Sequence, residues 1–474
     1  MHNFQLKLKH FEKLFLVLIF LLPIETFTIY LLKIPKTIQI YHIFVFLGLL
    51  FACICYIRTR KIPINKTILF LYIGYCTISI LSMFINLDKI IDINPTWYVN
   101  NVQGYSKIWD MPMMSTIYRG VIKPFELLFF IISLFYIFNI PNIKYKIIKV
   151  LIVITWITSI YSIYQIFAYK FNLPFGLIFS NINQTNSLWT VNDMCRVSGL
   201  FFEPGTQAIF LTWTWILLLS QFFEKNKFSI LMSKKHLFVL FVCTTIALIY
   251  TISPIAYIAM NLGTAIYFIL AYKQLDLTSI IKQNFSKVVC VLLCLIICLS
   301  IILIKFNVSD LCEYIIDKIK ISLFSMNDPI IYLNQDSRSV RLFGAMETFK
   351  DHIMWGIGPG NSGFHYYHYV PFVAPLPMNL FVPFINAYSA ILGELGIMGM
   401  IFFLPLILYP CYIYIKNKIY VNYSKNIVTA LMAAYIITIS ISFMSLDYPK
   451  LPTFWIFYIL LVLLIKTKHI KLLQ

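Results

Sequence analysis

Two arginines stand in the densest polar patch of an otherwise apolar chain, within residues 337–361. Arg338 and Arg341 are three residues apart, so they lie on a similar heading if the stretch is helical. Asp336 or Ser337 can accept an orphan backbone N–H group and begin such a helix. Two guanidinium groups beside the N–H groups of a helix start form a site for phosphate or carboxylate.

The helix that must position these arginines is predicted from apolar periodicity and from a Gly-rich stop. One stripe is formed by residues at helical spacing, namely Leu342, Met346, Phe349 and Ile353. The sequence Gly-Ile-Gly-Pro-Gly-Asn at 356–361 then ends the helix. The alternative is that both arginines are solvated or pair with Asp336 and Glu347, in which case the helix has no binding role.

A second polar segment, residues 194–211, stands directly before an apolar run. A cation at the level of Arg196 could hold a lipid-linked phosphate at headgroup depth. Otherwise Arg196 is an interfacial arginine that snorkels to water. Glu203 precedes Pro204 at the start of the next helix, so it is a candidate catalytic carboxylate or simply a favourable helix-start residue.

Glu394 is an unusual carboxylate, because it lies near the start of an apolar run. An ionisable group at that depth is costly and is a functional candidate. The glycines around it, Gly393, Gly396 and Gly399, allow close approach of a neighbouring element. The alternative role for Glu394 is that of a structural partner for a nearby hydroxyl or arginine.

His352 is the candidate general base of the 337–361 segment, since histidine titrates near neutral pH. His365 and His368 stand in an aromatic-rich sequence, which favours a place at the membrane interface. No HExxH motif, pair of CxxC motifs or cluster of aspartates occurs in the sequence, so we predict neither a metal nor a cofactor.

The composition predicts an all-α polytopic membrane protein. Of 474 residues, 60% are hydrophobic and only 12% are charged, whereas soluble proteins have about 25% charged residues. The net charge of +19 is explained by lysines in short loops between apolar runs, as the positive-inside rule requires, rather than by nucleic-acid binding. Cys195 and Cys312 fall in predicted outer loops, and the sequence leaves undecided whether they form a disulfide.

Twelve apolar runs are long enough to span a bilayer, and together they form one membrane domain over residues 1–474. The basic loops place both termini in the cytoplasm, with the first span kept as an anchor. Three long outer segments follow, of which 306–385 is the largest, and we expect short helices within them. No predicted inside loop is large enough to form a domain, and no Walker motif occurs in the sequence. We therefore expect the chemistry at the outer face of the membrane. The predicted spans are 14–32, 38–57, 67–86, 121–140, 147–169, 205–223, 236–253, 254–272, 287–305, 391–415, 426–445 and 452–465.

Three segments in order resemble the O-antigen ligase and O-antigen or capsule polymerase (Wzy-type) superfamily: residues 196–208, 337–361 and 383–399. The layout of spans and large outer loops is similar too. The resemblance implies a metal-independent glycosyltransferase whose donor is a saccharide on undecaprenyl pyrophosphate. It also implies that Arg196 and Arg338, with Arg341 close by, contact the pyrophosphate.

One departure from the family pattern favours a polymerase. Ligases carry a His-Asn pair in the third motif, where this chain has Ile385-Asn386. The general base is then one of Glu203, His352 and Glu394. Alternatively, the acceptor hydroxyl loses its proton late, and charge stabilisation at the leaving pyrophosphate supplies most of the catalysis.

We therefore expect an O-antigen polymerase in the bacterial cytoplasmic (inner) membrane that joins undecaprenyl-pyrophosphate-linked repeat units into O-antigen, capsule or a related surface polymer. Its partners would be these lipid-linked oligosaccharides and the bilayer, with a chain-length regulator and a flippase as further candidates and no nucleic acid. One alternative is a ligase that transfers the glycan to lipid A–core. Another is a flippase or transporter of the same lipids, although charges within the spans are sparse for that role.

Overall fold

The computed structural model describes residues 2–22, 40–60, 63–88, 116–140, 142–171, 173, 190–191, 194–201, 204–224, 231–272, 337–362, 386–416, 425–443 and 452–465. Within them the predicted all-α class is confirmed apart from one short antiparallel pair of strands, β1 (Thr190–Val191) and β2 (Met194–Cys195). The helices, with π-helical segments marked η, are α1 (His2–Leu21), α3 (Ile40–Thr59), α4 (Lys66–Ile85), η3 (Tyr118–Ile122), α8 (Lys123–Phe138), α9 (Ile143–Phe171), α10 (Pro204–Phe222), α11 (Lys234–Tyr250), α12 (Pro254–Tyr272), α16 (Ser337–Asp351), α18 (Ala387–Lys416), α19 (Lys425–Ile437), η6 (Thr438–Ser442) and α21 (Pro452–Ile465).

Helices lie on the described parts of the predicted spans; span 287–305 and the second half of span 14–32 are outside the described residues. The predicted division at Pro254 is confirmed, since α11 ends at Tyr250 and α12 begins at Pro254. Within the described part of the chain, five helical segments are long and apolar enough to cross a membrane, so the count of twelve spans stays a prediction. These five are Ile40–Thr59, Lys66–Ile85, Tyr118–Phe138, Ile143–Phe171 and Ala387–Lys416.

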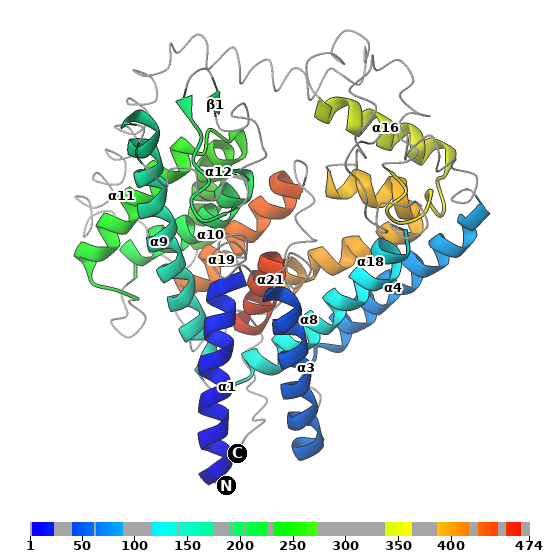
Figure 1. The fold of residues 1–474 in the computed structure, drawn as a ribbon, viewed down its shortest axis with the longest axis horizontal. Helices are drawn as coiled ribbons and strands as arrows, with labels where there is room; N and C mark the ends of the chain where they lie inside the picture. The colour runs from blue at the N-terminus through cyan, green and yellow to red at the C-terminus, as the bar shows by residue number, and fades with distance from the viewer. Residues whose placement is uncertain are drawn as a thin grey trace.

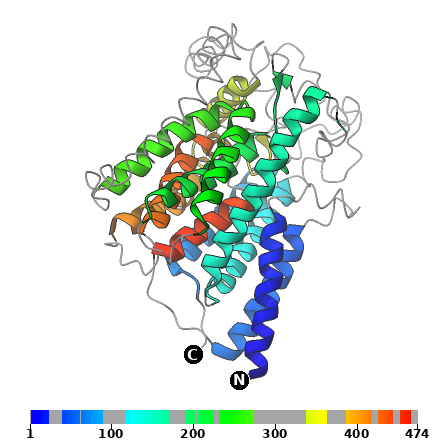
Figure 2. The same cartoon turned by 90° about the vertical axis from the view of Figure 1, so that its left-hand side faces the viewer.

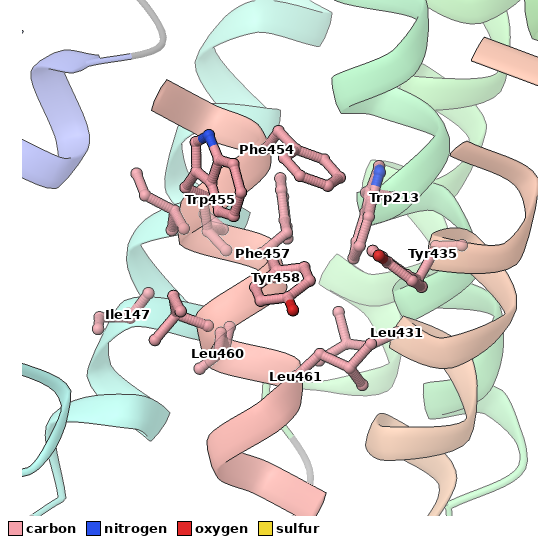
Figure 3. Packing of buried hydrophobic residues seen from close by; sticks show 14 of the residues in the cluster. Ile147, Trp213, Leu431, Tyr435, Phe454, Trp455, Phe457, Tyr458, Leu460 and Leu461 are labelled. Carbon is pink, nitrogen blue, oxygen red and sulfur yellow. The ribbon is translucent and has the colours of Figure 1, made fainter. Parts of the chain in front are cut away.

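The core of the bundle surrounds α21. This helix is apolar on all sides and almost entirely buried, as expected of a central helix. Figure 3 shows Trp213 of α10 and Tyr435 of α19 facing it. The Trp213 ring stacks on Phe457 with centroids 4.3 Å apart, and its Nε1–H donates to the Thr438 hydroxyl at 2.7 Å. Aromatic packing and a satisfied indole N–H thus join α10, α19 and α21.

A proline in α18 leaves a backbone carbonyl without its helical donor, and α21 supplies a donor instead. Pro410 has no N–H, so it cannot donate to the Leu406 carbonyl one turn earlier. The Tyr458 hydroxyl donates to that carbonyl instead, at 2.7 Å. The buried backbone oxygen of a membrane helix is thereby paired across the core.

The candidate segments gather at one end of the molecule. In Figures 1 and 2, α16 and the β1–β2 pair lie at the end opposite the start of α1. Figure 1 also shows α16 lying over α18, and the two helices are in contact. The tertiary structure therefore places the first two polar segments of the sequence on the same end of the bundle.

Candidate functional site

A break in α18 is the centre of the candidate site. Gly396 has φ 64° and ψ −160°, which interrupts the helix. In an unbroken helix Ile397 N–H would donate to the Gly393 carbonyl and Met398 N–H to the Glu394 carbonyl. Here all four of these groups bond to residues 353–358. Residues 353–358 and 393–398 are called the α18 splice here. Its bonds are Ile357 N to Gly393 O at 3.0 Å, Gly358 N to Glu394 O at 3.0 Å, Ile397 N to Ile353 O at 2.9 Å and Met398 N to Met354 O at 3.2 Å.

Two glycines allow the backbones of the splice to touch. A Cβ on Gly356, which has φ +64°, would be 2.3 Å from the Glu394 carbonyl carbon. A Cβ on Gly396 would be 2.4 Å from the Met354 carbonyl oxygen. Of the glycines predicted to allow close approach near Glu394, Gly396 does so, whereas the atoms nearest to a Cβ on Gly399 belong to Leu395 and Ile391 of its own helix. No side chain fits at Gly356 or Gly396.

The splice holds the Glu394 carboxylate in a defined place. Its Oε1 accepts a hydrogen bond from the Ser362 hydroxyl at 2.6 Å, and the side chain is half-buried. The preceding residue, Asn361, is buried and donates to the Ile357 carbonyl at 2.8 Å. Its side-chain oxygen accepts from the Thr116 hydroxyl at 2.5 Å. A carboxylate with one hydroxyl donor on a fixed turn could act as a general base.

Arg119 lies beside the candidate site, and sequence reasoning did not identify it. It lies in η3, and its stem passes beside Gly360, where a Cβ would be 2.6 Å from Arg119 Cδ. Gly120 contacts the same turn, because a Cβ there would be 2.5 Å from the Pro359 ring. The π-helical segment that presents Arg119 leaves no recognisable sequence motif, although such segments are common at functional sites.

The structure confirms the α16 helix but corrects its packing face. The helix runs over Ser337–Asp351, as its predicted ends indicate. The predicted apolar stripe is only half-buried over its first three members, and its last member, Ile353, is 48% exposed. The buried face is Gly344, Ala345 and Thr348, with Ala345 packed against Ala390 of α18. Small residues face α18 because the two helices approach closely there.

The charged residues of α16 are only partly described. Glu347 pairs with Lys350 at 2.5 Å on the surface of the helix. Arg338 and Arg341 lie in the first two turns of the helix, and their side chains are outside the described part of the structure. His352 follows the helix, half-exposed, and its carbonyl accepts from Gly356 N at 2.9 Å.

Other predicted residues have mixed outcomes. Glu203, Ile385, His365, His368 and Cys312 lie outside the described residues. Asn386 begins α18, since its side-chain oxygen accepts from the backbone N–H groups of Tyr388 at 2.9 Å and Ser389 at 3.3 Å. The asparagine of the third motif is thus a helix cap in this fold.

Arg196 is anchored at the junction of α11 and α12. Its Nε–H donates to the Thr251 carbonyl at 3.2 Å, at the carboxyl end of α11, where a cation is favoured. The next residue, Val197, donates its N–H to the Tyr250 carbonyl at 2.9 Å. Arg196 is therefore hydrogen-bonded at this junction, and its side chain is half-exposed.

Comparison with known families gives a match over the region that contains the α18 splice. Residues 239–404 match the family model of the O-antigen ligases. These residues form an O-antigen ligase domain. The predicted resemblance to that superfamily is confirmed, and Wzy-type polymerases fall within it. No curated protein matches the chain.

The matched region is about a third of the chain. It runs from α11 through α16 and the splice into α18, so it contains Arg338, His352 and Glu394 but not Arg196. Members of this O-antigen ligase family are glycosyltransferase-like enzymes of surface polysaccharide synthesis that act on lipid-linked oligosaccharides in the membrane.

Proposed function

We propose that the chain is an O-antigen polymerase, a membrane glycosyltransferase that joins undecaprenyl-pyrophosphate-linked repeat units. The growing glycan would leave its carrier and join the non-reducing end of a new lipid-linked unit. The observation that carries the proposal is Ile385, which stands inside the O-antigen ligase domain where ligases have their histidine. The reaction would take place at the outer face of the cytoplasmic membrane, with both termini in the cytoplasm.

In this proposal the arginines bind the leaving group. Arg338 and Arg341 stand in the first two turns of α16, where the helix dipole also favours an anion. Arg196 would reach the same pyrophosphate from the α11–α12 junction. Guanidinium groups pair with phosphate oxygens through two parallel bonds. They would stabilise the negative charge that develops as the bond between the sugar C1 and the phosphate oxygen breaks.

Glu394 is the base that the geometry supports best. The acceptor hydroxyl oxygen would form a bond to C1 of the donor sugar, while the C1–oxygen bond to pyrophosphate breaks and the hydroxyl proton moves to the Glu394 carboxylate. Support comes from its half-buried place, its orienting bond from Ser362 and the backbone splice beneath it. His352 and Glu203 are the alternative bases.

A ligase is the second candidate, because the matched family is named for that activity. A deletion strain distinguishes the candidates on a gel of surface polysaccharide. Loss of a polymerase leaves lipid A–core with single repeat units, whereas loss of a ligase leaves bare core and long polymer on the carrier. Loss of a flippase would trap units on the cytoplasmic side. Within the polymerase proposal, Arg338→Ala should remove the long chains while the protein stays in the membrane, and an unchanged ladder would refute its assignment to the pyrophosphate.

A further inference from the structure

A glutamine of α9 holds the loop that carries Arg196. The Gln165 side-chain oxygen accepts hydrogen bonds from the backbone N–H groups of Ser198 at 3.2 Å and Gly199 at 2.9 Å. Gln165 is 3% exposed, so these bonds are shielded from water. One buried oxygen thus fixes two successive residues, two and three positions after Arg196.

Two backbone N–H groups of this loop are bonded within the protein. Gly199 has φ +54°, and consecutive N–H groups in such a turn form a concavity that can bind an anion. Here the concavity is filled by the Gln165 oxygen. The backbone N–H groups of Ser198 and Gly199 are therefore committed internally. Within residues 196–199, the positively charged group that suits a phosphate is the Arg196 guanidinium.

The loop packs closely against its neighbours at Gly199. A Cβ on Gly199 would be 2.6 Å from Thr158 Cγ2 and 2.8 Å from the Gln207 side-chain nitrogen. That nitrogen donates to the Ser162 hydroxyl at 2.6 Å, and both residues are fully buried. The loop therefore lies directly on α9 and α10, and its height above them is set by the bonds to Gln165.

Two further bonds fix the direction of the arginine. The Val197 N–H donates to the Tyr250 carbonyl, and the Arg196 Nε–H donates to the Thr251 carbonyl. Because a guanidinium group is planar, a bond from the Nε–H restricts the plane in which the two terminal nitrogens lie. The orientation of these terminal nitrogens thus depends on where the loop is held.

From this arrangement we propose that Gln165 is a positioning residue, which places the Arg196 guanidinium for the phosphates of a lipid pyrophosphate. The inference rests on the proposed function. It assigns Gln165 no contact with substrate, because its oxygen is occupied by the loop and its side chain is buried.

The test separates the acceptor oxygen from the size of the side chain. Gln165→Glu keeps an oxygen for the two N–H groups, whereas Gln165→Met keeps the length but removes it. We expect Gln165→Met to raise the KM for an undecaprenyl-pyrophosphate-linked donor about tenfold to a hundredfold, since small misplacements of a binding group have such effects. Gln165→Glu should restore a KM close to that of the unmodified protein.

Gln221→Met is the matched control. The Gln221 oxygen also accepts a loop N–H, from Leu231 at 3.1 Å, but at the far end of α10 from Gln207. This variant loses one part-buried bond between a glutamine side chain and a loop, and it should leave the donor KM unchanged. If Gln221→Met raises the KM as much as Gln165→Met, the effect is general destabilisation and the inference is overturned.

A double-mutant cycle with Arg196→Ala completes the test. If Gln165 acts through Arg196, Gln165→Met adds no further increase in KM once the arginine is removed. A wild-type KM in Arg196→Ala would refute the proposed role of Arg196 itself. A raised KM in Arg196→Ala with a normal KM in Gln165→Met would overturn only the role of Gln165. If Gln165→Met does not accumulate in membranes, Gln165→Asn, which draws the oxygen back from the loop, supports the same comparison.

Discussion

Substitution of Gly356 by alanine should disrupt the α18 splice without unfolding the rest of the protein. Gly356 has φ +64°, and an alanine there would bring its Cβ to 2.3 Å from the Glu394 carbonyl carbon and 2.4 Å from its oxygen. Both neighbours are backbone atoms, so a side-chain rotation cannot relieve the clash. We expect Gly356→Ala to move residues 356–358 away from α18.

The cost can be worked from the bonds that this movement breaks. A left-handed conformation costs an alanine about 1–2 kcal/mol. Loss of the two bonds that the Ile357 and Gly358 N–H groups donate to α18 adds about 1–3 kcal/mol each, since both donor residues are buried. The total is about 3 kcal/mol at the least, within the stability of a typical domain. The protein should therefore stay folded while Glu394 shifts, which reduces turnover about a hundredfold if the shift reaches about 1 Å.

Hydrogen-exchange mass spectrometry and a polymer-length gel test this together. Peptides that contain residues 353–358 and 393–398 should lose protection in Gly356→Ala, and long chains should disappear. Gly263→Ala is the control, because its nearest neighbour is the tip of the flexible Ile216 side chain, 2.6 Å from the new Cβ. Wild-type protection of both peptides in Gly356→Ala would refute the splice as a rigid support, and normal protection with a full ladder in that variant would refute its link to function.

Two further predictions concern the base and the core. Glu394→Gln keeps the shape of the side chain but removes the base, so turnover should fall about 10²–10⁴-fold. Ser362→Ala removes only the orienting bond and should lower turnover less. Wild-type turnover in Glu394→Gln would exclude this residue as the base. Tyr458→Phe should cost about 1–3 kcal/mol in unfolding experiments because it orphans the Leu406 carbonyl. The same change on a Pro410→Ala background should cost much less, since alanine restores the helical N–H; equal costs in both backgrounds would contradict this account.

Several features of the fold follow from local sequence. Apolar runs and the positions of lysines predict the helices and their division at Pro254, because the bilayer demands long apolar segments with paired backbones. The limits of α16 were also predictable, since helix ends depend on nearby residues and on the glycines at 356–360. Likewise, the superfamily could be recognised from three short segments, one of which is 337–361.

The packing of these elements against one another could not be predicted from local sequence. The predicted stripe of α16 assumes that large apolar residues face the protein, yet Ala345 and Ala390 meet there because small side chains permit the closest contact. Arg119 comes from a segment far from Gly360 in the sequence, and only the fold brings them together.

The sequence by itself determined which groups could do chemistry, because residue type sets charge and proton affinity. It marked Glu394 and its glycines, and it marked Arg196. The tertiary structure decided how those groups are held. The broken turn of α18 is completed by backbone from residues 353–358, and the Arg196 loop is completed by Gln165. Backbone groups carry the same donors and acceptors at nearly every residue, so their long-range partners leave no signature in sequence.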